Sequence, residues 1–205
     1  MRKKSYKWTL NIIPTYTSLL IHFDINLISK KSVIDIVKEQ MKFLPNKSLP
    51  LSNDHYYIPV LYGGECGPDL SRVANTLKMK EKEVIRLHTQ KPSQVLCFSA
   101  NGQALMGKSR IPDRIGRLET PHISNAEGAV AIVGSQSTIY PRKQPGGWNV
   151  IGRTPWEVVN VALNPITPFK IGDWIHFFEI KQGEWNKYKN KQENRLDFWG
   201  EGSNE

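Results

Sequence analysis

The sequence has 205 residues, of which 39% are hydrophobic and 23% are charged, a composition that excludes collagen, coiled coils and wholesale disorder. Its formal net charge is +9, and residues 1–50 carry nine Lys or Arg against three Asp or Glu. These cations are scattered between apolar positions instead of being gathered on one face with aromatic residues, so we favour a solvated basic surface over nucleic-acid binding.

The N-terminal segment predicts neither a membrane span nor a secretion signal. The uncharged stretch from Trp8 to Phe23 is interrupted by Asn11 and Pro14, so it does not provide the roughly 20 apolar residues that a span needs. No apolar stretch with a cleavage site follows the basic start. Cys66 and Cys97 lie far apart and form no C-x-x-C pair. We therefore expect a cytoplasmic chain with reduced thiols and no membrane contact.

The first ninety residues predict a small α/β arrangement. β-Branched and aromatic residues predict strands over 15–23 and 56–62, and Pro59 in the second strand is typical of an edge or a bulge. Apolar residues at helical spacing, with Ser32 as a cap, predict the helices. These helices cover residues 32–44, 68–77 and 82–88.

From Gln94 onward the pattern changes to short apolar runs separated by Gly, Pro, Ser and Asn. Short strands at this spacing are typical of a β-barrel or a sandwich. The predicted strands cover residues 95–98, 129–133, 148–151 and 174–180. The polar tail from Lys181 to Glu205 contains isolated aromatic residues, and we expect it to be mobile or to dock on a partner.

Two short motifs suggest chemistry but lack its structural context. Gly102–Ser109 fits the G-x-x-x-x-G-K-[ST] phosphate-binding pattern with Lys108 as its lysine, yet Pro112 would break the helix that such a loop must open. Cys66 has Pro68 where a nucleophile elbow needs glycine. We interpret the first motif as a chance match and Cys66 as a turn thiol. The five histidines show no metal-ligand spacing, so no metal site is predicted.

The segment Tyr140–Glu157 contains the most informative candidate site. Thr154, with Pro155 next to it and Glu157 three residues on, forms a capping box that predicts a helix start. Arg153 lies directly before the backbone N–H groups that this helix would leave free. Such groups favour a carboxylate or a phosphate.

A glycine turn lies before this predicted helix. Gly146 and Gly147 follow Pro145 and allow the backbone to turn tightly, which leaves Trp148 at the rim. Together with Arg153, the turn suggests an anion site. The alternative that stays open is a plain turn in which Arg153 binds loop carbonyls.

Four ordered blocks of sequence carry a family resemblance. They read IPVLYGGECGPDL at 58–70, VIRLH at 84–88, GAVAIVGSQSTIYP at 128–141 and PGGWNVIGRTP at 145–155. They resemble the family that contains the 5-oxoprolinase B subunit, the kinase inhibitor KipI and allophanate hydrolase subunit 1, and the resemblance spans about residues 9–180. It implies an α+β chain with a small α/β N-terminal domain at 1–90, a cyclophilin-like β-barrel domain at 91–182 and a polar tail at 183–205.

The chain departs from the family pattern in two places. The strand and helix that precede the family's P-x-Y-x-S-L-L segment are apparently missing before Pro14. Residues 97–112 replace the family's G-F-x-P-G-F-x-Y-L loop. Both departures bear on partner binding and activity.

The resemblance implies a subunit of an ATP-dependent 5-oxoprolinase that converts 5-oxoproline to glutamate only with paralogous partner subunits. ATP and magnesium would act at the level of the complex. The alternatives are a KipI-type inhibitor that binds a sensor histidine kinase and a subunit like those of allophanate hydrolase or urea carboxylase. The residues implied in substrate or phosphate binding are Gln136, Gly146, Gly147, Trp148, Arg153 and Thr154. His88 is a weaker candidate for proton transfer.

Overall fold

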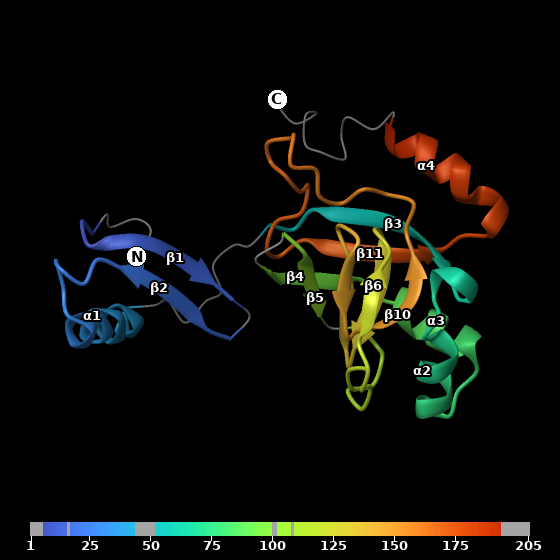
Figure 1. Ribbon diagram of the computed structural model, residues 1–205, viewed down its shortest axis with the longest axis horizontal. Helices are drawn as coiled ribbons and strands as arrows, with labels where there is room; N and C mark the ends of the chain where they lie inside the picture. The colour runs from blue at the N-terminus through green and yellow to red at the C-terminus, as the bar shows by residue number, and fades with distance from the viewer. Residues whose placement is uncertain (1–5, 16, 44–51, 100–101, 108, 194–205) are drawn as a thin grey trace. The chain divides into compact units, whose positions relative to one another are not determined.

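The structure is a computed structural model that describes residues 6–15, 17–43, 52–99, 102–107 and 109–193 (Figure 1). Its internal contacts divide the chain into two units, Met1–Leu51 and Ser52–Glu205, each of which is described by itself. Within the described ranges, no helix is both long enough and apolar enough to span a membrane.

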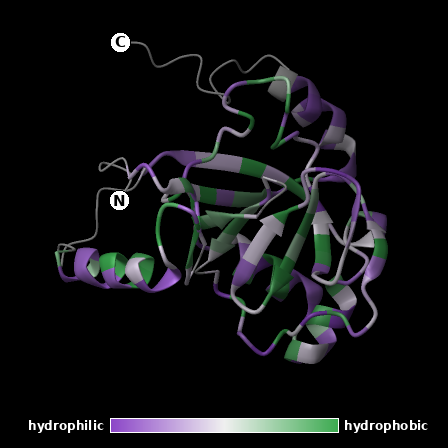
Figure 2. Ribbon diagram, turned by 60° about the vertical axis from the view of Figure 1, so that its left-hand side comes forward, coloured by the Kyte–Doolittle hydropathy of each residue, from purple (hydrophilic) through white to green (hydrophobic). Residues whose placement is uncertain are grey.

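The first unit is a β-hairpin with one helix. Strands β1 (Thr9–Pro14) and β2 (Leu19–Phe23) pair antiparallel, and α1 (Lys30–Lys42) follows. Ser29, not Ser32, is the N-cap of α1, because Ser29 has extended backbone and its side chain accepts a hydrogen bond from the Ser32 N–H at 3.1 Å. Apolar and polar residues alternate along this helix (Figure 2), as expected of a helix that buries one face.

The hairpin corrects the single strand predicted over residues 15–23. The Thr15 N–H donates to the Ser18 carbonyl at 2.9 Å, which closes the hairpin before β2 begins at Leu19. Thr15 and Ser18 therefore belong to the connection between β1 and β2. The strand on its N-terminal side was not predicted.

The second unit contains a closed seven-stranded barrel in the order β10-β3-β11-β4-β5-β8-β7. A separate pair, β6 (His122–Asn125) and β9 (Gln144–Gly146), forms a two-stranded ribbon. The prediction of an α+β fold with a β-barrel is confirmed. The barrel strands are β3 (His55–Tyr62), β4 (Ser93–Phe98), β5 (Ala104–Gly107), β7 (Ala129–Val133), β8 (Gln136–Ile139), β10 (Asn149–Arg153) and β11 (Trp174–Glu179).

Strand β3 belongs to the barrel, and this moves the expected boundary at residue 90 back to the Leu51–Ser52 junction. β3 runs parallel to β11 over six residue pairs, from His55 opposite Trp174 onward. On the other side of β3, strand β10 pairs only with Leu61 and Tyr62, the last two residues of β3. Pro59 thus lies where β3 has one neighbour, which is compatible with its missing N–H although β3 is not an edge strand.

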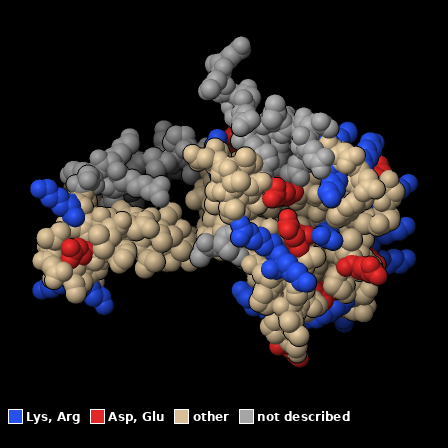
Figure 3. Space-filling model, turned by 45° about the horizontal axis from the view of Figure 1, so that its top comes forward, with Lys and Arg blue, Asp and Glu red and all other residues tan. Residues whose placement is uncertain are grey.

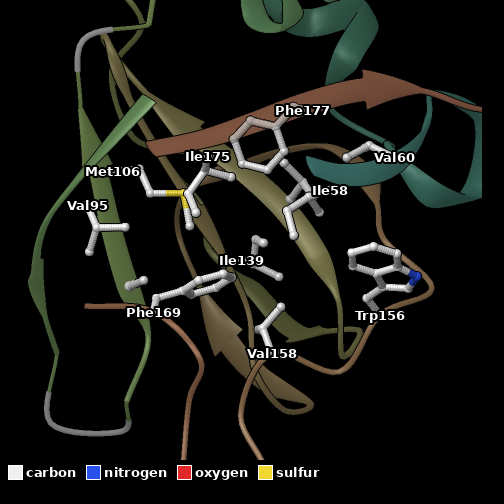
Figure 4. Close-up of a cluster of buried hydrophobic side chains, with 12 residues drawn as sticks. Ile58, Val60, Val95, Met106, Ile139, Trp156, Val158, Phe169, Ile175 and Phe177 are labelled. Carbon is white, nitrogen blue, oxygen red and sulfur yellow. The ribbon is translucent and has the colours of Figure 1, made fainter. Parts of the chain in front are cut away.

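The barrel interior is filled by apolar side chains that point toward one another (Figure 4). Ile58, Met106 and Ile175 are completely buried, and Trp156 and Phe169 enter the same cluster from outside the strands. Burying such side chains contributes about 1.5–3 kcal/mol each. This packing keeps the strand ends in place around the site described below.

Helices α2 (Leu70–Leu77) and α3 (Glu81–Thr89) form a second apolar cluster with the barrel. Their buried faces contact Ile132 of β7 and Ile151 of β10. The helices predicted over 68–77 and 82–88 are therefore present. Their attachment to β10 holds the loop before α2 beside the end of that strand.

The tail predicted from residue 183 is partly helical and docks on the second unit. It begins with η2 (Gln182–Glu184) and continues as α4 (Trp185–Glu193), beside β3 and β11 in Figure 1. The Trp156 indole N–H donates to the Tyr188 carbonyl at 2.8 Å. In the view of Figure 3, the cations and carboxylates of the chain are interspersed, which agrees with a solvated surface.

Candidate functional site

A cleft of about 940 Å³ opens on the second unit where several segments converge. Its lining comes from residues 61–66 at the end of β3, from 127–128, from 153–157 after β10 and from the C-terminal helices. Clefts of this size are typical of small-molecule sites. It combines residues from two of the four blocks that carry the family resemblance, at 58–70 and 145–155.

The loop after β3 takes its shape from glycine. Gly63 and Gly64 have φ of 72° and 52°, a region that favours glycine. Gly67 lies so close to β10 that a Cβ there would be 2.1 Å from the Ile151 carbonyl oxygen. The Gly63 N–H donates to the same oxygen at 3.1 Å. The loop is thus held on β10 and directs Glu65 and Cys66 into the lining of the cleft.

Arg153, the last residue of β10, supplies a positive charge to the cleft. Its Nε donates to the Glu127 carbonyl at 2.8 Å, and its guanidinium carbon lies 5.5 Å from the centre of the Trp185 ring. Among the described residues, Arg153 forms no ion pair with a carboxylate. Of the two sequence interpretations, the contact of Arg153 with a loop carbonyl is observed, whereas its binding of an anion stays a prediction.

The prediction of a helix that starts at Thr154 is wrong, because residues 154–160 adopt no helix. Trp156 and Val158 are both buried in the barrel core, a spacing that does not place them on one face of a helix. Thr154 Oγ1 instead accepts from the Trp156 N–H at 3.2 Å. The chain after Arg153 therefore offers an anion no helix N-terminus, and Arg153 itself offers its side chain.

Thr154 is fixed by its neighbour across the cleft wall. Its N–H donates to the Gly128 carbonyl at 2.9 Å. Gly128 has a φ of 78°, and a Cβ on it would lie 2.4 Å from the Thr154 carbonyl oxygen. Thr154 and Arg153 are thus the two predicted site residues that line the cleft.

Cys66 lies in the cleft as a protonated thiol. Burial raises its pKa above the usual value, and this effect exceeds the opposing attraction of Arg153 for a thiolate. An activated nucleophilic cysteine has a lowered pKa. The interpretation of Cys66 as a turn thiol agrees with this environment, within η1 (Gly64–Cys66).

His88 is enclosed at the packing surface between α3 and the barrel, outside the cleft lining. Its Nδ1 lies 2.7 Å from the Tyr62 hydroxyl and its Nε2 lies 3.0 Å from Ser137 Oγ, while its ring stacks on Phe177. Burial lowers the pKa of His88 to about 3, so the ring is neutral at physiological pH. This environment favours a structural role over proton transfer to a substrate.

The remaining predicted site residues lie elsewhere in the second unit, outside the cleft lining. Gln136 opens β8 opposite Val133, and Gly146 ends β9 where a Cβ would lie 2.2 Å from the Tyr140 hydroxyl. Trp148 packs with Tyr140 and has the Arg117 guanidinium 6.0 Å from its ring centre. These residues and Gly147 do not line the cleft. The structure therefore separates the predicted glycine turn from Arg153.

Part of the Gly102–Ser109 motif, which matches the phosphate-binding pattern, is a barrel strand. Residues 104–107 form β5, and Met106 is fully buried in the core. The backbone N–H groups of a paired strand are not free to surround a phosphate. Lys108 lies outside the described residues. Within the described residues, no group of three or more His, Cys, Asp or Glu side chains is arranged to hold a metal ion.

The sequence analysis missed Trp185 and Lys189, which line the cleft from α4. The two are four residues apart, the spacing at which helix side chains share a face. This spacing was the one feature of the sequence that could have paired the two residues, and it lies in a segment without a regular apolar pattern. Their place in the cleft depends on the packing of α4 against residues far from it in the sequence, which the local sequence pattern does not encode.

Comparison with known proteins agrees with this architecture. The family described as "Carboxyltransferase domain, subdomain C and D" matches residues 1–169. The chain belongs to this family. It is 33% identical over 196 residues to the 5-oxoprolinase B subunit of Bacillus subtilis (strain 168), a match that covers 88% of this chain and 79% of that protein. The protein of the same name in Escherichia coli O157:H7 is 33% identical over 62% of this chain and 58% of its own length.

Solved structures show the same fold. A conserved uncharacterized protein of Pyrococcus horikoshii is 31% identical, with a TM-score of 0.60 over 90% of this chain and 84% of that chain. The urea carboxylase of Kluyveromyces lactis has a TM-score of 0.75 over 92% of this chain, which corresponds to 19% of that chain, at 15% identity. At that identity the likeness concerns the fold alone.

Proposed function

We propose that this chain is the B subunit of an ATP-dependent 5-oxoprolinase, which converts 5-oxoproline to glutamate together with paralogous partner subunits. The observation that carries the proposal is the 33% identity to a 5-oxoprolinase B subunit over 79% of that protein. The sequence blocks at 58–70 and 145–155 supply walls of the cleft. The cleft therefore coincides with the segments that carry the family resemblance.

The chemistry that the proposal requires explains why a charged cleft is needed. A lactam carbonyl is a poor electrophile, and transfer of the terminal phosphoryl group of ATP to its oxygen creates a leaving group. Water then adds to the lactam carbon and the C–N bond opens, which leaves an acyl phosphate on the new carboxyl group. A second water displaces the phosphate, so that glutamate, ADP and phosphate result. Fixed positive donors stabilise the anionic groups along this route. In this chain, Arg153 lines the cleft and forms no ion pair with a carboxylate of the described residues.

The proposal divides the work between chains. This chain contributes the carboxylate- or phosphate-binding cleft, and ATP with magnesium is handled at the level of the complex. Cys66 and His88 have no place in the chemistry, because the first is a protonated thiol and the second is enclosed away from the cleft. The chain is accordingly not catalytic alone.

The test compares two arginine variants in the assembled complex. The chain is co-expressed with its paralogous subunits, the complex is purified, and glutamate and ADP are measured with 5-oxoproline and ATP present. Arg153→Ala should lower the rate at least about tenfold while the complex still assembles, because one charge-assisted contact is lost. Arg142→Ala removes an exposed arginine that does not line the cleft and should retain the wild-type rate.

Two results would contradict the proposal. A purified complex that releases no glutamate from 5-oxoproline shows that the chain has another activity. A complex of this chain with a sensor histidine kinase, accompanied by inhibited autophosphorylation, would favour the inhibitor alternative.

A further inference from the structure

Helix α4 presents two side chains of different chemistry to the cleft. Trp185 and Lys189 both line it, one helical turn apart on the same face. Both lie beyond residue 169, where the match to the family ends. The segment that the family model matches therefore forms only part of the cleft wall, and helix α4 completes the wall.

Several contacts hold α4 in this position. The Tyr188 carbonyl accepts from the Trp156 indole, and the Tyr188 ring meets Phe178 edge-on, with the ring centres 5.5 Å apart. At the start of η2, the Lys181 N–H donates to the Glu184 carboxylate at 2.9 Å. Because Trp156 is buried in the barrel core, α4 is attached to that core.

Trp185 also orients Arg153. The Trp185 ring covers the guanidinium at 5.5 Å, and the Nε donor is already used by the Glu127 carbonyl. The donors that remain are on the two Nη atoms, which form no hydrogen bond within the described part of the chain. A planar guanidinium fixed in this way is suited to bind a carboxylate with two parallel hydrogen bonds.

The charges around the cleft select among anions. Arg153 and Lys189 are positive, whereas the exposed side chains of Glu65, Glu127 and Glu157 are negative and also line it. A ligand with one carboxylate can be attracted by the two cations, and its single negative charge is only weakly repelled by the glutamates. A nucleoside triphosphate, with three or four negative charges, meets a cleft whose carboxylates outnumber its cations.

We propose that α4 completes a binding site for a small monocarboxylate, in which Lys189 joins Arg153 as the second cation, Trp185 forms the apolar wall, and nucleotides are excluded. This inference rests on the proposed function for the identity of the ligand, 5-oxoproline. It goes beyond that function by assigning the substrate, and not ATP, to this cleft, and by making residues outside the family match determinants of specificity.

The test measures 5-oxoproline binding to the full chain by titration calorimetry. Lys189→Ala should weaken binding about tenfold, and Lys189→Arg should restore most of it, because a second cation returns. Lys187→Ala is the matched control: Lys187 lies on the same helix near the Tyr188 ring, does not line the cleft, and should change affinity less than about twofold. ATP should neither bind to the chain nor displace 5-oxoproline.

A second measurement separates this inference from the proposed function. In the active complex, Lys189→Ala should raise the KM for 5-oxoproline about tenfold with little change in the KM for ATP. Equal effects of Lys189→Ala and Lys187→Ala, or competition by ATP, would overturn the inference while leaving the proposed function intact. A chain that binds 5-oxoproline but supports no turnover would instead overturn the function. Failure of the wild-type chain to bind 5-oxoproline, alone and in the complex, would overturn the inference.

Discussion

Arg153 connects the sequence prediction to the geometry of the cleft. The sequence placed it before a helix start, and the structure places it at the end of β10 with a tryptophan on its face and a carbonyl on its Nε. Arg153 could be chosen as a candidate from the sequence, because an arginine next to a glycine-containing loop is typical of an anion-binding site. Its partner Trp185, 32 residues further along the chain, was not predictable from local pattern.

Arg153→Lys should separate charge from geometry. Lysine retains the positive charge but loses the planar fork, the stacking on Trp185 and the contact with Glu127. We expect the kcat/KM of the assembled complex to fall about tenfold or more, whereas the free energy of unfolding changes by less than about 1 kcal/mol. Parallel steady-state kinetics and urea unfolding check this. A loss of stability with unchanged activity per folded molecule would show that Arg153 only braces the loop.

His88 should make the stability of the second unit depend on pH. Its pKa is lowered to about 3 in the fold by burial, against about 6.5 in the unfolded chain, so the unfolded state binds the proton first as pH falls. The contribution of neutral His88 is complete above pH 6.5 and is lost progressively as pH falls toward 3. Between pH 7 and pH 5 the loss from this residue is about 2 kcal/mol.

Urea unfolding of wild type and His88→Gln at pH 5, 6 and 7 measures this effect. The variant should be less stable at pH 7, because Tyr62 and Ser137 lose a well-placed partner, but its stability should vary less with pH. His176 also has a lowered pKa, through burial and the charge of His55, and it remains in both proteins. Identical pH slopes for the two proteins would contradict the assignment.

At the scale of the secondary-structure elements, β7 was predictable from its sequence, whereas β8 and β9 were not. The run of residues 129–133 predicts β7 with the observed ends, because it is apolar throughout, and its first four residues are buried. β8 and β9 contain Gln, Ser, Thr, Pro and Gly, and only pairing with their neighbours makes them strands. The capping pattern at Thr154 failed for a related reason: core packing of Trp156 and Val158 outweighs a local helix signal of about 1 kcal/mol.

The loop between β3 and α2 should not tolerate a side chain at its most crowded point. Gly67→Ala would place a Cβ 2.1 Å from the Ile151 carbonyl, so β10 or the loop must shift. We expect a loss of more than about 2 kcal/mol in the free energy of unfolding, measured by urea denaturation. Gly183→Ala is the control, since no atom lies within 4 Å of its Cβ and the change should stay within about 0.5 kcal/mol. Similar stabilities of the two variants would show that the loop is not fixed to β10.

At the scale of the whole molecule, one barrel brings together residues from both ends of the second unit. β3 and β11 pair in parallel although more than a hundred residues separate them, and α4 returns to the β3 side of the cleft. The change in sequence pattern near residue 90 marks the start of the short barrel strands along the chain. It does not mark a boundary in space, because β3 had already entered the same sheet.

The most direct test of the central claim is the rate of 5-oxoproline-dependent ADP release by the paralogous partner subunits with and without this chain. The account predicts ADP and glutamate in equal amounts when chain, partners, 5-oxoproline and ATP are all present, and neither product when the chain is omitted. Equal rates with and without the folded chain would contradict it, since the cleft around Arg153 would then contribute nothing to the reaction.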